Sequence, residues 1–272
     1  MDLENYFISL FQSKHIGDDG AYIDGTVYSK DAFFENIHFK KEWMDYKNIA
    51  RKSMLVNISD AIAMNAKPLY ALLSVAMPKT MSKEDMKSLA DGFYSVAKEY
   101  NFDIIGGDTI SNTKLDITVT IISKTRDPLL RSKVKNGYEL AYTGVLGESK
   151  KNLQTLFNGG KLHKKSKFLD IKLRDSFVYK TRRFLKAGMD ISDGLYSDLD
   201  KMARSSGVGV KFFKKISKNT ACSGEEYEML VAYDKRDAKA VKRLAHLTRT
   251  PLTPFAKACR NRYINRCKAH HF

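Results

Sequence analysis

The chain has 272 residues and a mass of 30.9 kDa, with 43% hydrophobic and 29% charged residues, which is typical of a globular protein with a sizeable core. No apolar run approaches the roughly 20 residues that a membrane-spanning helix needs. The first five residues lack the basic-then-apolar order of a signal peptide, so we expect a cytoplasmic location and no membrane partner. Lys and Arg outnumber Asp and Glu by 47 to 31, and this net charge of +16 favours anionic partners such as nucleotides, phosphorylated metabolites or nucleic acid.

Three cysteines occur, at Cys222, Cys259 and Cys267. Their number is odd and their spacing contains no CxxC pair, so neither a disulfide framework nor a zinc site is indicated. The sequence predicts three free thiols.

The first half of the chain alternates helical and extended patterns. A hairpin is expected over residues 21–30, with its turn at Asp24-Gly25. Apolar residues at helical spacing predict a helix over 47–66 that Pro68 ends, and Ser82 with Asp85 opens another over 82–100. The other expected elements are a short helix over 2–13, a turn over 15–20, and strands over 69–77, 102–105 and 115–122.

The second half begins where the chain turns polar, at residues 133–138. We place a domain boundary there, which gives domains 1–136 and 137–272. The elements expected after it are strands over 139–144, 208–213 and 227–233, helices over 149–157, 175–187 and 194–205, and a basic linker over 159–175. Helices and strands alternate in both halves, so the fold class is mixed α and β in two lobes.

Aspartates beside glycine or serine at expected turns and element ends are the main chemical feature. They stand at positions 18, 19, 31, 60, 108, 190 and 193. Mg²⁺ takes one or two carboxylates per ion and completes its shell with water and substrate phosphate, and a neighbouring glycine lets the backbone approach a phosphate closely. Each aspartate alone is more often a cap or turn residue. Together they predict a magnesium site.

Two common ATP-site designs are absent, because the sequence contains neither a Walker A motif nor the HRD and DFG motifs of protein kinases. A basic C-terminal stretch from Lys235 to Arg266 raises a nucleic-acid hypothesis. Aromatic residues are sparse there and no nucleic-acid-binding motif occurs, so we expect a solvated basic face and no nucleic-acid partner.

A set of motifs in order along residues 16–230 resembles the thiamine-monophosphate kinase family, which belongs to a superfamily with the aminoimidazole ribonucleotide synthetase fold. The motifs are Ile16-Gly17-Asp18-Asp19, Asp31 followed by Glu35-Asn36-Ile37-His38-Phe39, Asn57-Ile58-Ser59-Asp60, Gly106-Gly107-Asp108-Thr109, Thr143-Gly144-Val145-Leu146-Gly147, Met189-Asp190-Ile191-Ser192-Asp193-Gly194 and Ser223-Gly224-Glu225-Glu226-Tyr227-Glu228. Each is weak to moderate alone, and the ordered set is specific.

The resemblance implies a homodimer whose N-terminal lobes pair strands across the two-fold axis, a C-terminal α/β lobe, and phosphorylation of thiamine monophosphate to thiamine diphosphate by ATP with several Mg²⁺ ions. It implies metal ligands at Asp19, Ser29, Asp31, Asp60, Asp108, Asp190 and Asp193. It implies ATP contacts from Gly107, Asp108, Arg131 and Ser192, and thiamine contacts from His38 and Glu225. Asp60 and Asp193 are the residues expected to be catalytic.

Four positions depart from the family pattern. Lys30 replaces a threonine before Asp31, Asn65 a glycine, Glu226 an aspartate, and Ala269 a C-terminal aromatic residue that would stack on the substrate. Two alternatives therefore stay open: a catalytically silent nucleotide-binding homologue, and another ATP-dependent synthetase of the superfamily.

Overall fold

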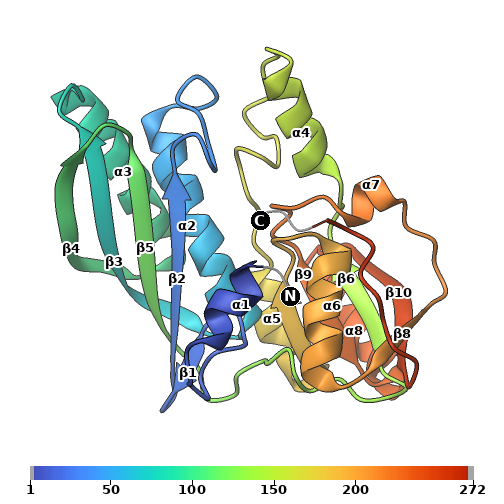
Figure 1. Ribbon diagram of the computed structural model, residues 1–272. Helices are drawn as coiled ribbons and strands as arrows, with labels where there is room; N and C mark the ends of the chain where they lie inside the picture. Colours follow the sequence, from blue (N-terminus) through green and yellow to red (C-terminus); the bar gives the residue numbers. More distant parts are fainter. Residues whose placement is uncertain (1–2, 269–272) are drawn as a thin grey trace.

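The computed structural model describes residues 3–268 and has a mixed α and β architecture with two five-stranded sheets (Figure 1). This confirms the predicted fold class. The helices are α1 (Leu3–Ser9), α2 (Tyr46–Ala63), α3 (Lys83–Tyr100), α4 (Glu148–Phe157), α5 (Asp175–Thr181), α6 (Leu195–Ser206), α7 (Lys218–Ala221) and α8 (Ala238–Leu247). The strands are β1 (Ala21–Ile23), β2 (Thr26–Phe34), β3 (Lys67–Pro78), β4 (Asp103–Asn112), β5 (Asp116–Lys124), β6 (Glu139–Thr143), β7 (Leu185–Asp190), β8 (Gly209–Phe212), β9 (Met229–Tyr233) and β10 (Leu252–Cys259).

The first sheet has the strand order β1-β2-β5-β3-β4. Strands β1 and β2 form the predicted hairpin, and both turn residues, Asp24 and Gly25, have positive φ angles, as a two-residue hairpin turn requires. Strand β4 pairs in parallel with β3 and forms an edge of the sheet. We expected the strand at 102–105 to end before Gly106-Gly107-Asp108, and this prediction was wrong because the strand continues through all three. A Cβ on Gly107 would lie 1.6 Å from the Leu73 oxygen, so glycine is what allows the pairing to continue.

Helix α2 is the central element of the molecule. It contacts β2 and β5 of the first sheet, α3 beside it, and β7 of the second sheet. Thirteen of its eighteen residues are buried, as expected of a helix enclosed between two layers. Asp45 caps its N-terminus by accepting a hydrogen bond from Asn48 N at 2.8 Å. The helix ends at Ala63, four residues before β3, so the end expected at Pro68 lies within the next strand.

The second sheet has the order β7-β9-β6-β10-β8, with α6 packed against it. The helix expected over 175–187 ends earlier: α5 is followed by a short 3-10 turn and then by β7, which begins at Leu185. This matters for the site, because β7 carries the chain directly to Asp190.

The two sheets span residues 21–124 and 139–259, on either side of the expected boundary near residue 136. One hydrophobic cluster nevertheless crosses it, joining Ile58 and Ile62 of α2 to Phe177 of α5 and Val231 of β9. The division into two domains therefore remains a proposal.

The cysteine prediction was wrong. Cys222 and Cys267 form a disulfide with a Cα–Cα distance of 5.5 Å, and Cys259 is free. The fold brings the C-terminal segment against the end of α7 across 45 residues of sequence, a proximity that spacing alone does not reveal. Across residues 3–268, no helix has the length and apolar character needed to cross a membrane.

Candidate active site

A cavity of about 240 Å³ lies where α2, β2 and the segment after β7 meet. Its lining comes from both halves of the chain: Glu4, Asp31, Ala32, Phe33, His38, Val56, Asp60, Asp190, Ser192, Asp193, Lys201, Glu225 and Tyr227. Seven residues predicted from sequence are in this set, namely Asp31, His38, Asp60, Asp190, Ser192, Asp193 and Glu225. Helix α1, which contributes Glu4, lies in front of the junction of the two halves in Figure 1.

A group of aspartates lies at the cavity, and three of its members, Asp31, Asp60 and Asp190, line it. Asp19, Asp60 and Asp190 each offer a carboxylate oxygen, and these oxygens lie within 4.8 Å of one another. Asp31 adds a fourth carboxylate, hydrogen-bonded to that of Asp60. The fold assembles them from the turn before β1, from β2, from α2 and from the end of β7.

The carboxyl pKa values rise in this group. Burial raises the pKa of Asp60 and of Asp190 well above the usual range, and neighbouring carboxylates raise it further. Burial also raises the pKa of Asp31 to about 6, partly offset by its hydrogen bond to Asp60. Unneutralised buried carboxylates resist ionisation together, so a bound cation would be stabilised here.

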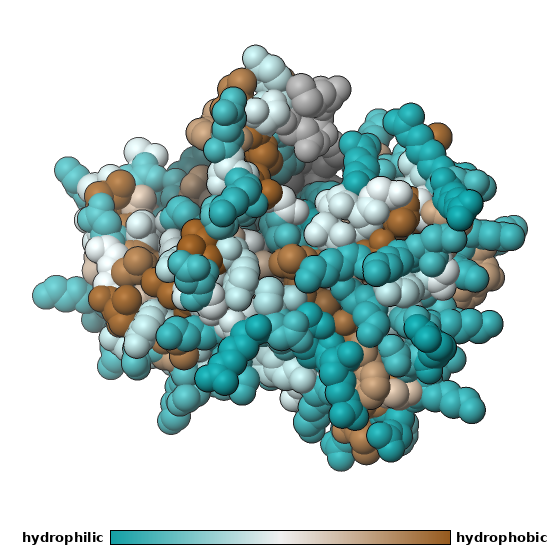
Figure 2. Space-filling model, turned by 90° about the horizontal axis from the view of Figure 1, so that it is seen from below, coloured by the Kyte–Doolittle hydropathy of each residue, from teal (hydrophilic) through white to brown (hydrophobic). Residues whose placement is uncertain are grey.

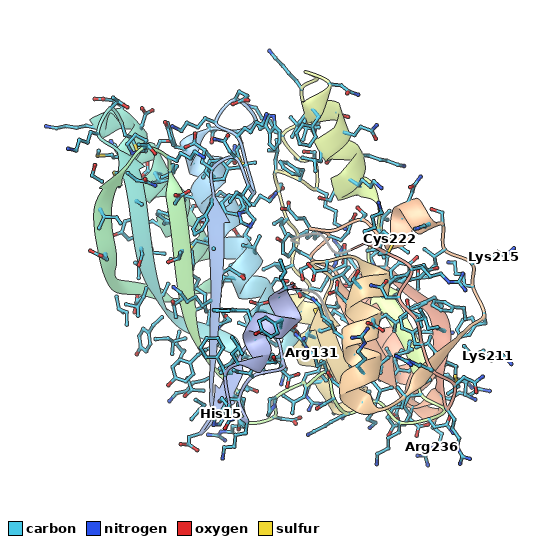
Figure 3. The ribbon with its side chains drawn as sticks, in the orientation of Figure 1. His15, Arg131, Lys211, Lys215, Cys222 and Arg236 are labelled. Carbon is cyan, nitrogen blue, oxygen red and sulfur yellow. A yellow bond between two sulfur atoms is a disulfide. The ribbon has the colours of Figure 1, made fainter. Side chains whose placement is uncertain are left out.

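Arg131 is a cation that lies beside this group (Figure 3). Its guanidinium forms an ion pair and a hydrogen bond with Asp19, and its backbone N–H donates to Asp18 Oδ1 at 2.7 Å. Burial raises the pKa of Asp19, an effect that Arg131 opposes. Arg131 thus lies beside the carboxylate group, and its predicted contact with ATP stays a prediction.

The segment after β7 turns sharply into α6. Gly194 has a φ of +96°, and a Cβ there would lie 3.1 Å from the oxygens of Ala221 and Ser223, so only glycine fits this close approach. Asp193, immediately before it, binds Lys201 Nζ through Oδ2 at 2.5 Å. Lys201 also pairs with Asp198 at 3.1 Å, and burial raises the pKa of Asp198 to about 7.

The cavity lining also includes His38, Glu225 and Tyr227. His38 Nδ1 accepts a hydrogen bond from Phe34 N at 3.0 Å, which leaves the ring proton of a neutral imidazole on Nε2. Glu225 binds the ammonium of Lys52 at 2.7 Å. Burial and the surrounding carboxylates, Glu225 first among them, raise the pKa of the Tyr227 hydroxyl well above its usual range.

Five predicted residues lie outside the cavity lining: Asp19 and Arg131, which pair beside it, and Ser29, Gly107 and Asp108. Ser29 is buried on the same face of β2 as Asp31, but its hydroxyl donates to Asn57 Oδ1 at 2.6 Å. Gly107 and Asp108 are exposed on the edge strand β4, which β5 and β3 separate from β2. Their predicted contacts with metal or ATP stay predictions.

The structure shows what the side chains do at two positions that depart from the family pattern, Lys30 and Glu226. Side chains alternate along a strand, so Lys30 points to the face of the first sheet opposite to Ser29 and Asp31, where its ammonium donates to Thr118 and Thr120. Glu226 Oε1 accepts from Gly147 N at 2.7 Å and from Ser223 Oγ at 2.6 Å. Ala269 lies outside the described residues.

The basic segment over 159–175 is tied to the loop that carries Glu225. Lys167 pairs with Glu226 at 2.9 Å and with Glu228 at 3.3 Å. Arg174 makes two hydrogen bonds of 2.7 Å to the Glu228 carboxylate. These two cations therefore hold the loop through Glu226 and Glu228, which are outside the cavity lining, and neutralise these buried carboxylates.

Sequence reasoning missed Lys52, Lys201, Tyr227 and Glu4. Lys52 carried a signal, because it stands three residues after Ile49 on the apolar face of the expected helix, where a lysine is unusual. Tyr227 lay inside a quoted motif, but nothing in the sequence placed its hydroxyl among carboxylates. Many other cations lie elsewhere: Lys211, Lys215 and Arg236 sit on the outer side of the second half (Figure 3).

The donors present suit magnesium. Asp19, Asp31, Asp60 and Asp190 supply hard oxygen ligands in one group, and burial keeps them from being fully solvated. The structure describes no histidine or cysteine in this group, so a softer metal such as zinc is a poorer match.

Comparisons with known proteins agree with this arrangement. The family described as AIR synthase related protein, N-terminal domain, matches residues 17–125. A thiamine-monophosphate kinase of Buchnera aphidicola subsp. Schizaphis graminum is 33% identical over 264 residues, covering 84% of this chain and 79% of that protein. The thiamine-monophosphate kinase of Bacillus subtilis is 30% identical, covering 74% and 67%.

Solved structures share the fold. One described as AaThiL complexed with AMPPCP and TMP superposes with a TM-score of 0.85 at 21% identity, over 99% of this chain and 94% of that one. Thiamine-monophosphate kinase from Stenotrophomonas maltophilia gives a TM-score of 0.79 at 23% identity, over 97% and 95%. From the identity and coverage of its sequence relatives, this chain belongs to the thiamine-monophosphate kinase family.

Proposed function

We propose that this protein phosphorylates thiamine monophosphate with ATP to give thiamine diphosphate. The observation that carries the proposal is one cavity, in a member of this family, at which clustered aspartates meet His38 and Glu225. The solved structure described as a complex with AMPPCP and TMP supports the binding of a nucleotide together with a second ligand in this fold.

In the proposed reaction, an oxygen of the thiamine monophosphate phosphate attacks the γ-phosphorus of ATP. The new P–O bond forms as the bond from that phosphorus to the β-phosphate oxygen breaks, and ADP leaves. A phosphate monoester is already largely ionised near neutral pH, so no dedicated general base is required. Two anions must approach each other, and catalysis is therefore mostly neutralisation of charge and in-line alignment.

Asp19, Asp31, Asp60, Asp190 and Asp193 are the residues proposed to hold magnesium, with Asp60 and Asp193 essential for turnover. Bound Mg²⁺ would neutralise phosphate charge and orient the reacting oxygens. Arg131 and Ser192 are proposed to contact ATP phosphates, and Gly107 with Asp108 to contact ATP from β4. The cavity is smaller than most ligand pockets, which are about 300–1,000 Å³, so it suits the reacting groups rather than two whole substrates.

A homodimer is part of the proposal. The face of the first sheet that α2 and α3 leave uncovered exposes Tyr28, Tyr70 and Leu72, and the edge strand β4 exposes Ile105 and Ile110. Hydrophobic residues are visible among polar ones on the left of Figure 2, the side on which the first sheet lies. An exposed apolar face that continues to an open edge strand is typical of a protein interface.

A cytoplasmic location also belongs to the proposal. The Cys222–Cys267 disulfide is the feature that tests it, because reducing compartments usually keep such thiols reduced.

The test is an assay of purified protein with ATP, Mg²⁺ and thiamine monophosphate, in which thiamine diphosphate and ADP are both quantified. Equal amounts of the two products support the proposal. ATP hydrolysis that depends on a non-phosphorylated acceptor would favour another synthetase of the superfamily, and Mg²⁺-ATP binding without product would favour a silent homologue. A phosphorylated protein trapped during turnover would refute direct transfer.

A further inference from the structure

Lys52 is a lysine in the hydrophobic interior of the protein. It lies on α2, and only 1% of its side chain is exposed. Its ammonium lies 3.6 Å from the ring centroid of Phe168 and 5.8 Å from that of Phe33, so aromatic faces enclose it on two sides. Phe33 itself lines the cavity.

The Lys52 ammonium is paired with the Glu225 carboxylate through Oε2 at 2.7 Å. Within residues 3–268, no other carboxylate lies within ion-pair distance of it. Burying an ammonium is costly unless an anion compensates it, so this pair is held firmly. Such buried pairs contribute little net stability, and fixing one geometry is their better-supported use.

Glu225 is held at a second point. Its backbone N–H donates to Ser192 O at 2.7 Å, and its φ of +53° lies in the left-handed region that few residues other than glycine adopt. Tyr227, two residues on, has a φ of +48°. Unfavourable backbone angles of this kind persist only where surrounding contacts enforce them, and they concentrate at ligand sites.

Lys52 and Asp60, one member of the aspartate group, lie on one ridge of α2. Lys52, Val56 and Asp60 follow one another at intervals of four residues, and Val56 and Asp60 line the cavity. Eight residues of helix span about 12 Å. The same rigid element thus carries Asp60 of the aspartate group and, about two turns away, the Lys52 side chain that pairs with Glu225.

We propose that Lys52 is a positioning residue: it fixes the Glu225 carboxylate through one oxygen so that the other can accept hydrogen bonds from a cationic or amine-bearing acceptor substrate. This inference rests on the proposed function for the identity of that acceptor, thiamine monophosphate, which carries a cationic ring and an amine. We expect ATP affinity to depend less on the pair, because the side chains proposed to contact ATP make no bond to the Lys52 ammonium or the Glu225 carboxylate among the described residues.

The test compares Lys52→Met, which removes the charge at similar volume, with Lys52→Arg, which keeps it. Lys47→Met is the matched control, because Lys47 is an exposed lysine on the same helix. We expect Lys52→Met to raise KM for thiamine monophosphate at least about 10-fold while KM for ATP stays within about 2-fold. Lys52→Arg should recover part of the loss, and Lys47→Met should match the wild type.

Unchanged kinetics in Lys52→Met would overturn the inference while leaving the proposed function intact. Equal losses for both substrates that follow a lower melting temperature would also overturn it, because they indicate a merely structural role. Crystal structures of the wild type and of Lys52→Met decide the matter even if the wild type shows no turnover. A displaced Glu225 carboxylate supports the inference, and an unmoved one refutes it.

Discussion

Ser59 donates a hydrogen bond of 2.7 Å to Asp190 Oδ2, and the two residues are 131 positions apart in the chain. Ser59 belongs to α2 and Asp190 ends β7, so this buried bond joins the two halves next to the aspartate group. Asp60, the residue after Ser59, belongs to that group together with Asp190. The candidate site therefore exists only when both halves are correctly packed.

Asp60→Asn should lower the activity without lowering the stability of the metal-free protein. The substitution removes one of several buried, mutually repelling carboxylates, so the metal-free protein should melt at the same temperature or higher. The stabilisation by Mg²⁺ should shrink, and kcat should fall at least about 100-fold. Thermal melts with and without Mg²⁺ and a kinetic assay measure both effects.

Asp91→Asn is the control for that experiment, because Asp91 is an exposed aspartate on α3. It should leave melting temperature and kcat within the range of ordinary surface substitutions. Full activity in Asp60→Asn would remove Asp60 from the proposed site.

The aspartate group should make Mg²⁺ binding depend on pH. Burial raises the pKa of Asp31 to about 6, above its unfolded value of 3.8, so the folded protein keeps a proton that the unfolded chain loses. This group's contribution to stability is therefore present at low pH and is lost as the pH rises from about 4 to about 6, when Mg²⁺ is absent. Mg²⁺ needs the ionised form, so its affinity should increase over the same range.

The measurement is the increase in melting temperature caused by Mg²⁺, at about pH 5 and about pH 7. The increase should be larger at the higher pH, and calorimetry should detect proton release on binding. An increase that is equal at both pH values would contradict the assignment of buried carboxylates as the ligands.

The disulfide should stabilise the fold. A link across 45 residues restricts the unfolded chain, and replacing both cysteines with Cys222→Ser and Cys267→Ser should lower the free energy of unfolding by about 2–4 kcal/mol. Urea denaturation measures the change, and Cys259→Ser serves as the control. A thiol assay on the unreduced, unfolded protein should find one thiol per chain; three would restore the prediction made from sequence.

Lys30 should be unimportant for the metal site. It points away from Asp31 and binds Thr118 and Thr120 on the opposite face of the sheet. Lys30→Thr should therefore leave the Mg²⁺ dependence of kcat unchanged, within about 2-fold. Size-exclusion chromatography of the variant would show whether this residue affects self-association instead. A marked change in Mg²⁺ affinity would show that Lys30 does reach the metal site.

Local patterns predicted much of the fold. Asp24-Gly25 identified the hairpin turn, and Ser82 identified the start of α3, where its hydroxyl accepts from Asp85 N at 3.1 Å. Both signals act over a few residues, which is why they could be read without tertiary contacts. The predictions failed where contacts between distant segments determine the secondary structure. Strand β7 is an example: it begins at Leu185, inside an expected helix, because β9 pairs with it.

The site residues show the same contrast between local motifs, which could be read from sequence, and long-range contacts, which could not. Ordered motifs led to Asp60, Asp190 and Glu225, which the fold brings to one cavity. They could not show that Arg131 would pair with Asp19, or that a buried lysine would hold Glu225, since both depend on contacts between distant segments. Spacing likewise gave no indication of the Cys222–Cys267 link.

Phosphorus NMR of one reaction mixture tests the central claim most directly. Purified protein, Mg²⁺, ATP and thiamine monophosphate would be followed over time, with Asp60→Asn beside the wild type. Our account predicts that the thiamine monophosphate signal disappears as thiamine diphosphate and ADP appear in equal amounts, and that the variant shows almost none of this change. An unchanged thiamine monophosphate signal with intact ATP, in a protein that binds Mg²⁺ and ATP, would contradict it.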